Sequence, residues 1–550
     1  MRFARYQLFY FFVFTVLLLS IVSHFCFSWI GFNPTDDGFI LSLSRRIIDG
    51  QFPHRDIIFI RPALSPVIHV PFVLFGGEYT FWISRLFVWV ELASISCIWT
   101  VIILRKFFTI KFNFTIYLFF SLLCFVFSTY TAFVFAYSTY DALFLYSIGL
   151  LFCYGNFKYT RLAGYFIVGL SYLCRQNFLV MVPVTLWLLG DLKRVSYWTA
   201  AVLPGIIYLL IMTVYGAAGD FLKQVFSLSG SFHGGFKIYI KNWGFWVFML
   251  AGYVLMYTTH KNEKLISQGK SDFPSITGWI VYLILPVASL IFLSREIYPL
   301  FISFCLFGFV LGITIFLLTR KQYAQFKQAL FLLLTGWVVS ISIGMSYPAL
   351  LSGEYIIYIT IIFLRLYNET AISKEDFKFK FNLSNVVLSV LVISGFAYAR
   401  LTYTYRDKPS GELHFIIEDV IKGSKNIQTN INTYIFLEDL KRAVSLVSGR
   451  DYCILPDLSA YWVKSSRENP LSFSWANKTE LNSRIFDKRV RNELEDKKDL
   501  VIILQKVYAN SIQRGKTPAK LNNLYSPLID YVKDNFQKFS ETEYFELYKK

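Results

Sequence analysis

Two adjacent carboxylates lie in the part of the sequence best suited to chemistry. Asp36 and Asp37 stand between Pro34 and Gly38, just after a long apolar segment at the amino end. Neighbouring carboxylates repel each other when ionised and burial disfavours their charged form, so one pKa should be raised. Such a carboxylate suits a general base that removes a proton from a hydroxyl group. In the alternative interpretation, Asp36 caps the following helix and both side chains are solvated.

Four arginines suggest that a phosphate group binds near the two carboxylates. Arg55 and Arg61 follow in the same polar segment, Arg85 lies near the start of the next apolar stretch, and Arg175 interrupts a later one. A guanidinium can bind two phosphate oxygens at once, so these residues predict a site for a donor phosphate. Each also has a plainer interpretation, because an arginine at the end of a membrane span can simply reach lipid headgroups.

Four further side chains are candidates for contact with a sugar or an acceptor: His54, Asp141, Glu354 and Tyr355. His54 could assist proton transfer, although a loop histidine is more often just solvated. Tyrosine is common in the interfacial belts of membrane proteins, which offers a structural explanation for Tyr355.

The sequence predicts neither a metal centre nor another cofactor. No group of His, Cys, Asp and Glu has convincing metal-ligand spacing, and no glycine-rich loop suits a nucleotide diphosphate. Asp36 and Asp37 could nevertheless hold a divalent ion.

The elements that position these residues are mostly membrane helices. The 550 residues carry a formal charge of +18, yet only 16% are charged and 55% are hydrophobic. A soluble nucleic-acid-binding protein of this charge would have about a quarter of its residues charged. Residues 406–550 contain 24 basic and 20 acidic side chains, which leaves 30 and 16 for residues 1–405. We therefore expect a polytopic helical domain followed by a soluble one.

Uncharged stretches in residues 1–405 predict about 13 transmembrane helices, the first being a retained signal anchor. The stretch 162–190 is expected to form two short helices that meet at Arg175. With these spans, 19 of the 30 Lys and Arg residues fall on the side of the amino end. The positive-inside rule then places the amino end in the cytoplasm, and places the first loop, 31–80, and residues 406–550 outside.

The two outer regions have their own predicted structure. In the first loop, Phe39–Ile48 is expected to form a short amphipathic helix at the membrane interface. In the tail, apolar runs at 451–455 and 500–504 predict strands, and the run at 500–504 has the composition of a strand buried on both faces, as in a parallel sheet. Helical spacing near 436–447, 485–498 and 527–537 completes a small α/β domain.

The first part of the chain resembles the GT-C class of membrane glycosyltransferases, which includes protein O-mannosyltransferases and the bacterial aminoarabinose transferases for lipid A. The features that match are the acidic pair after the first span, a Gly-x-x-Pro-x-x-Asp turn from Gly50 to Asp56, and the passage from Phe75 to Leu86. The similarity covers about residues 1–215, and beyond them only the general plan agrees.

The resemblance implies a hexosyl or pentosyl transferase of the bacterial inner membrane. It would move a sugar from a polyprenyl-phosphate carrier to a lipid, glycan or protein acceptor at the periplasmic face, without nucleic acid. Asp36 would be the base and Asp37 its orienting partner, with their order left open. From the chemistry alone, direct displacement by an activated acceptor hydroxyl would invert the anomeric centre.

Two other functions remain open at the level of sequence. A polytopic lipid or solute transporter would also need buried arginines, but it usually shows repeated halves, which this sequence lacks. An O-antigen-type ligase or polymerase shares the substrate class, but it would be expected to place its chemistry in a large later outer loop.

Overall fold

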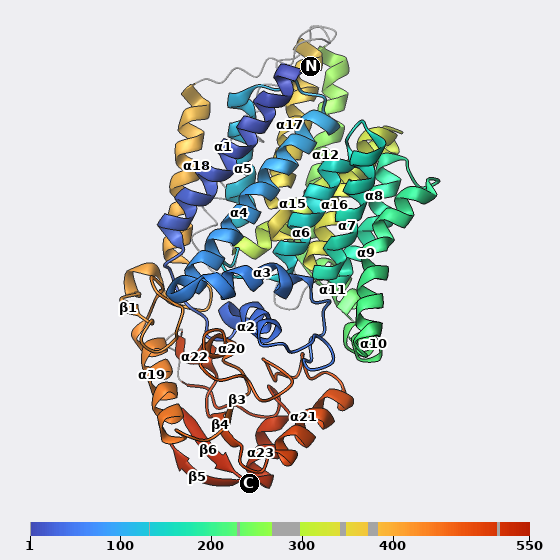
Figure 1. The fold of residues 1–550 in the computed structure, drawn as a ribbon. Coiled ribbons are helices and arrows are strands. Elements are labelled where there is room, and N and C mark those ends of the chain that lie inside the picture. Colours follow the sequence, from blue (N-terminus) through green and yellow to red (C-terminus); the bar gives the residue numbers. More distant parts are fainter. Residues whose placement is uncertain are drawn as a thin grey trace.

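The structure, a computed structural model, describes residues 2–130, 132–227, 231–266, 298–341, 348–371, 383–513 and 518–550. The chain is 67% helical and has a small sheet region near its carboxyl end. Figure 1 shows a bundle of helices with the amino end at its top and the sheet at the opposite end of the molecule. Helices α2 and α3 lie across the bundle axis between these two parts.

Long apolar segments form the bundle. Its helices are α1 (Arg2–Phe27), α4 (Thr80–Val101), α5 (Phe114–Thr129), α6 (Ser138–Cys153), α7 (Lys158–Cys174), α8 (Met181–Leu189), α9 (Val195–Val214), α12 (Trp243–Ile266), α15 (Tyr298–Thr319), α16 (Tyr323–Ser340), α17 (Ser352–Ala371) and α18 (Leu383–Thr402). The shorter α10 (Ala218–Phe226) and α11 (Ser231–Ile240) lie between α9 and α12 in the chain.

Several of these helices suit a membrane. In the described part of the chain, four helical segments are long and apolar enough to cross one: Tyr6–Phe27, Gly77–Phe107, Val195–Val214 and Phe301–Thr319. The total of about 13 spans stays a prediction. One of the uncharged stretches counted in this total, 276–293, lies outside the described residues. The apolar window of Gly77–Phe107 is 83% buried and that of Val195–Val214 only 22%, so α4 is central and α9 peripheral.

The predicted helix break at Arg175 is confirmed. Helix α7 ends at Cys174, Arg175 has an extended backbone, and a 3-10 turn (Gln176–Val180) leads into α8. The break places a polar backbone inside the protein, where Asn177 donates hydrogen bonds to the carbonyl oxygens of Val338 and Ile341.

The first loop, 31–80, which is predicted to lie outside, folds into two helices rather than one. The expected helix Phe39–Ile48 is present as α2 (Asp36–Ile48), which starts three residues earlier and so includes both aspartates in its first turn. No helix is predicted for residues 64–75, but the structure has α3 (Leu64–Phe75) there. Its two prolines explain why the sequence does not predict this helix, because proline usually breaks a helix. Pro66 stands in the first turn, where proline is tolerated, and Pro71 is inside the helix.

The tail forms a small α/β unit, in agreement with the predicted pattern. Its main sheet has the order β3-β4-β6-β5, with β3 and β4 parallel and β6 antiparallel to both β4 and β5. The strands are β3 (Tyr452–Leu455), β4 (Val501–Gln505), β5 (Gln537–Glu541) and β6 (Phe545–Lys549). All residues of β4 are buried, as predicted. A smaller sheet pairs β1 (Phe415–Ile416) with β2 (Gln428–Thr429).

The tail's helices also match the expected positions. The three predicted ones are α19 (Ile431–Leu446), α21 (Arg484–Asp496) and α23 (Leu528–Asn535), and two short ones are α20 (Ser459–Trp462) and α22 (Ala509–Gln513). Buried apolar side chains of α2, α3 and the tail belong to one cluster, which includes Ile40, Leu43, Val73, Leu437 and Leu458. The tail therefore packs directly on the two helices that lie across the bundle.

Candidate functional site

The acidic pair is set by the loop that joins α1 to α2. The Asn33 side-chain oxygen accepts hydrogen bonds from the backbone N–H groups of Thr35 (3.0 Å) and Asp36 (2.8 Å). The Asn33 N–H in turn donates to Asp37 Oδ2 (2.8 Å). Asn33, rather than Asp36, thus satisfies the first free N–H groups near the helix start, which leaves the Asp36 carboxylate available for other partners.

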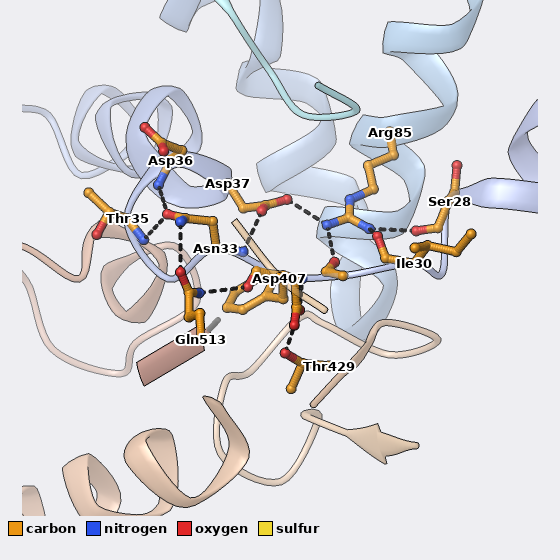
Figure 2. A network of polar contacts seen from close by, with 12 residues as sticks. Ser28, Ile30, Asn33, Thr35, Asp36, Asp37, Arg85, Asp407, Thr429 and Gln513 are labelled. Atoms are coloured by element: carbon orange, nitrogen blue, oxygen red, sulfur yellow. Dashed lines mark hydrogen bonds and ion pairs between the residues drawn. The ribbon is translucent and has the colours of Figure 1, made fainter. Parts of the chain in front are cut away.

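Asp37 is a buried carboxylate with both oxygens bound. Its Oδ1 accepts a hydrogen bond from Arg85 Nη2 at 2.7 Å. Arg85 also donates to the carbonyl oxygens of Ser28 (2.6 Å) and Gly31 (2.7 Å), so it gathers the loop around Asp37, as Figure 2 shows. The Arg85 guanidinium is therefore engaged by protein groups, and its predicted contact with a donor phosphate would require these bonds to open.

Asp36 has a different environment. Its Oδ2 accepts hydrogen bonds from Arg406 Nη1 (2.6 Å) and Tyr405 Oη (3.1 Å), whereas no described residue donates a hydrogen bond to its Oδ1. The side chain is 13% exposed. Burial raises the pKa of Asp36, an effect that Arg406 and the Tyr405 hydrogen bond oppose and the Asp37 charge reinforces. Asp36 therefore has the free oxygen that a general base needs.

The tail holds the same loop from the other side. Asp407 Oδ2 accepts from the Phe32 N–H (3.1 Å) and from Thr429 Oγ1 (2.7 Å). Gln513 donates to the Phe32 carbonyl (3.0 Å) and accepts from Asn33 Nδ2 (3.1 Å), contacts that lie beside Asp37 in Figure 2. The geometry of the acidic pair thus depends on both the bundle and the tail.

A third carboxylate, Asp457, follows strand β3. Its Oδ2 accepts a hydrogen bond from Tyr525 Oη at 2.5 Å, while its Oδ1 is buried and has no partner. Burial raises the pKa of Asp457 to about 6; the hydrogen bond of Tyr525 lowers it, and the charge of Asp36 raises it. Asp457 therefore lies within the electrostatic reach of Asp36.

A small cavity of about 40 Å³ opens beside Asp37. Its charged or hydroxyl-bearing lining residues are Asp37, Arg85, Arg400, Tyr403, Thr404 and Tyr405. Arg400 Nη1 donates to the Ala132 carbonyl (2.7 Å), and its guanidinium lies 5.2 Å from the centre of the Trp89 ring. No described carboxylate is within ion-pair distance of Arg400, so a cation without an acidic partner faces the cavity and suits an anionic ligand.

The other predicted phosphate ligands lie elsewhere. Arg55 is 46% exposed and pairs with Asp56 at 2.8 Å. Arg61 forms a buried ion pair with Glu480 of the tail at 2.9 Å. The guanidinium of Arg175 lies 5.8 Å from the centre of the Tyr137 ring. None of these three arginines lines the cavity beside Asp37.

The predicted sugar or acceptor ligands are engaged inside the protein, away from that cavity. His54 is fully buried between Gln224 and Tyr208, each at 2.9 Å, so the interpretation of a solvated loop histidine is wrong. Because burial lowers the pKa of His54 to about 4, it is neutral at physiological pH. The remaining three, Asp141, Glu354 and Tyr355, lie in α6 and α17.

These three helix residues are all fully buried. Asp141 accepts a hydrogen bond from Ser65 and pairs with His69 at 3.1 Å. Glu354 accepts from Ser128 Oγ at 2.8 Å. The Asp141 contacts join α6 to α3 and the Glu354 contact joins α17 to α5, so neither brings the side chain to Asp36.

Sequence reasoning missed the partners that the tail and α18 contribute. Arg400, Tyr405 and Arg406 belong to one tyrosine-rich stretch at the end of the last predicted span. A signal was available, because within residues 1–405 the predicted outer side favours arginine: 8 of its 11 basic residues there are Arg, and Arg400 is one of them. Asp457, by contrast, has no local pattern that marks it.

No metal site emerges from the part of the chain that the structure describes: there, no group of three or more His, Cys, Asp and Glu residues could hold an ion. Comparison with known proteins adds no further assignment, because no protein-family model, curated protein or solved structure matches this chain.

Proposed function

We propose that the chain is a membrane glycosyltransferase of GT-C type. It transfers a hexosyl or pentosyl group from a polyprenyl-phosphate carrier to an acceptor hydroxyl, with inversion. The observation that carries this proposal is the position of Asp36, to whose Oδ1 no described residue donates a hydrogen bond, next to a cavity lined by its neighbour Asp37, its partner Tyr405 and Arg400. A base beside an anion site is what glycosyl transfer from a lipid phosphate requires.

The steps follow from these groups. Asp36 Oδ1 accepts the proton of the acceptor hydroxyl as that oxygen forms a bond to C1 of the donor sugar. The bond between C1 and the phosphate oxygen breaks, and its electron pair leaves with the polyprenyl phosphate. Arg400 stabilises the charge that grows on this leaving group. Asp37 and Arg85 fix the loop that carries the base.

The position of the site supports a lipid-linked donor. Helices α2 and α3 lie across the end of the bundle (Figure 1), and the small cavity beside Asp37 would have to widen to receive the donor's headgroup while the lipid chain stays in the bilayer. The charge distribution favours a multi-pass protein of the inner membrane, with about 13 spans, a cytoplasmic amino end and a periplasmic α/β domain at 406–550. The acceptor class, whether lipid, glycan or protein, stays open.

The test is a comparison of Asp36→Asn, Asp37→Asn and a matched control in membranes. We expect Asp36→Asn to lower kcat at least about a hundredfold, because removing a general base has an effect of this order. The control is Asp49→Asn, which removes a carboxylate of the same loop that only pairs with Arg45.

Two measurements read the outcome. One is sugar transfer from a synthetic polyprenyl-phosphate donor, and the other is mass spectrometry of lipid-linked sugars that accumulate in a deletion strain. Full activity of Asp36→Asn at normal expression would exclude the proposed base. Movement of an intact solute without any glycosidic bond made or broken would favour the transporter instead.

A further inference from the structure

Residues 405–407 connect the last bundle helix to the tail and touch the candidate base. Arg406 has a φ of +52°, in the left-handed region that residues other than glycine rarely adopt. In this conformation Tyr405 and Arg406 both bond to Asp36, while the next residue, Asp407, accepts hydrogen bonds from Phe32 and Thr429. Such unusual backbone often marks functional positions, because the surrounding structure must stabilise it.

Arg406 and Arg400 have different surroundings. Arg400 lines the cavity beside Asp37 and has no acidic partner among the described residues. Arg406 is absent from the cavity lining and instead donates to Asp36 Oδ2 at 2.6 Å. Two arginines six residues apart in the chain are thus placed for two tasks, one toward an incoming anion and one toward the carboxylate.

The charges around Asp36 explain why it needs a cation. Asp37 lies next to it on α2 and its charge disfavours an ionised Asp36, while the charge of Asp36 in turn raises the pKa of Asp457 in the tail. Tyr405 donates one hydrogen bond, but Arg406 provides the positive charge in direct contact. Arg406 therefore opposes the protonation that burial of this carboxylate favours, and removing it would raise the pKa of Asp36 further.

We propose that Arg406 is the positioning residue of the base: it holds Asp36 in the ionised form and occupies Oδ2, so that Oδ1 is the oxygen that takes the acceptor's proton. This inference rests on the proposed function for its catalytic meaning. The coupling between Arg406 and Asp36 is a property of the protein that can be measured without any activity.

The first test is the pH dependence of sugar transfer in Arg406→Gln, Arg406→Lys and the control Lys408→Gln. Lys408 lies two residues away and pairs with Glu412 at the surface. Removing the cation raises the pKa of Asp36, and the base works only when ionised, so the acidic limb of the kcat profile should move to higher pH. In Arg406→Gln we expect the limb to shift by about one pH unit, with about a tenfold loss of kcat at pH values on its acidic side that recovers as the pH rises.

The matched variants separate positioning from substrate binding. Arg406→Lys keeps the charge and should restore most of the profile, Lys408→Gln should behave like the wild type, and the KM for the donor should change less than about twofold. An Arg406→Gln variant with a raised donor KM and an unshifted acidic limb would overturn the proposal, because Arg406 would then bind the donor phosphate.

The second test does not depend on activity. Dicyclohexylcarbodiimide adds to protonated carboxyl groups in apolar surroundings, and fragment ions in mass spectrometry can distinguish modified Asp36 from modified Asp37. In membranes, modification of Asp36 should extend to a pH about one unit higher in Arg406→Gln than in the wild type or Lys408→Gln. Identical labelling profiles would refute the coupling. A shifted profile together with full activity of Asp36→Asn would leave the coupling intact and refute the proposed function instead.

Discussion

Asp36 and Asp37 are neighbours in the chain, but their carboxylates have different hydrogen-bond partners in the structure. Asp37 has both oxygens bound, one by Arg85 and one by the backbone of Asn33, whereas Asp36 keeps one oxygen free. Burial raises the pKa of each, so the expectation of a perturbed acidic pair agrees with the structure. Sequence reasoning expected mutual repulsion of the two carboxylates to raise one pKa. In the structure, desolvation by burial is the larger cause of the raised pKa values.

Asp457 gives a prediction at the scale of one residue. Its pKa of about 6 in the folded protein exceeds the ordinary value of 3.8. Between pH 3.8 and about pH 6, the folded state therefore keeps a proton on Asp457 that the unfolded state has lost. Stability from this group is therefore complete below about pH 4 and is lost as the pH rises to about 6. The Asp457→Asn variant lacks this dependence.

We expect the stability of Asp457→Asn relative to the wild type to increase by up to about 3 kcal/mol between pH 4 and pH 6. Thermal unfolding in detergent across this range measures the difference. Parallel stability curves for the two proteins would show that Asp457 is not a buried acid of raised pKa in solution.

At the scale of elements, periodicity predicted much of the fold. Apolar runs located the bundle helices and the buried strands β3 and β4, because burial imposes a pattern on each element. Helix α3 was obscured by its prolines, and the β5–β6 hairpin by its many charged residues. Where a pattern conflicts with the local preferences of its residues, only the packing of the folded chain decides the structure.

The partners of the candidate base were beyond such reasoning. Arg406 lies 370 residues from Asp36 in the chain, and no local spacing relates the two. The acidic pair itself could be predicted, because the two aspartates stand together in the polar segment that follows the first apolar span. Of the four arginines predicted to bind a donor phosphate, only Arg85 contacts the pair.

Helix α2 gives a prediction at this scale, because it packs on α20 through Gly38. A Cβ atom at Gly38 would lie 2.1 Å from both Cα and N of Ala460, a distance that requires the backbones to move apart. Gly38→Ala should therefore separate α2 from the tail and destabilise the protein by about 1–3 kcal/mol or more, as overpacking does. Transfer activity should fall with it.

Thermal unfolding and limited proteolysis of the tail in detergent measure this effect. Gly219→Ala is the matched control, because Gly219 lies in α10 and a Cβ there meets nothing within 4 Å. Equal stability and equal protease resistance of the two variants would contradict the close contact between α2 and α20.

At the scale of the whole molecule, the proposed function depends on which side of the membrane the tail occupies. Lys193 lies in the predicted cytoplasmic turn between α8 and α9, and Glu543 lies in the tail between β5 and β6. Both side chains are exposed, so a cysteine at either position should react with a maleimide. The predicted orientation makes their accessibility in spheroplasts opposite.

We expect a membrane-impermeant maleimide to label Glu543→Cys in intact spheroplasts and Lys193→Cys only after lysis. Mass spectrometry of the labelled peptides distinguishes these sites from the seven native cysteines, of which six are buried. The reverse pattern would place Asp36 on the cytoplasmic side and contradict a donor bound at the periplasmic face.

The dependence of Asp36 on Arg406 also has a consequence for biosynthesis. The ribosome adds Asp36 long before Arg406. The tail that follows Arg406 must then fold before Asp407 and Gln513 can hold the loop. A nascent chain that has inserted only its helices lacks a competent base. Under the proposed function, folding of the last domain would therefore complete the active site, so that unfinished copies would not yet transfer sugar.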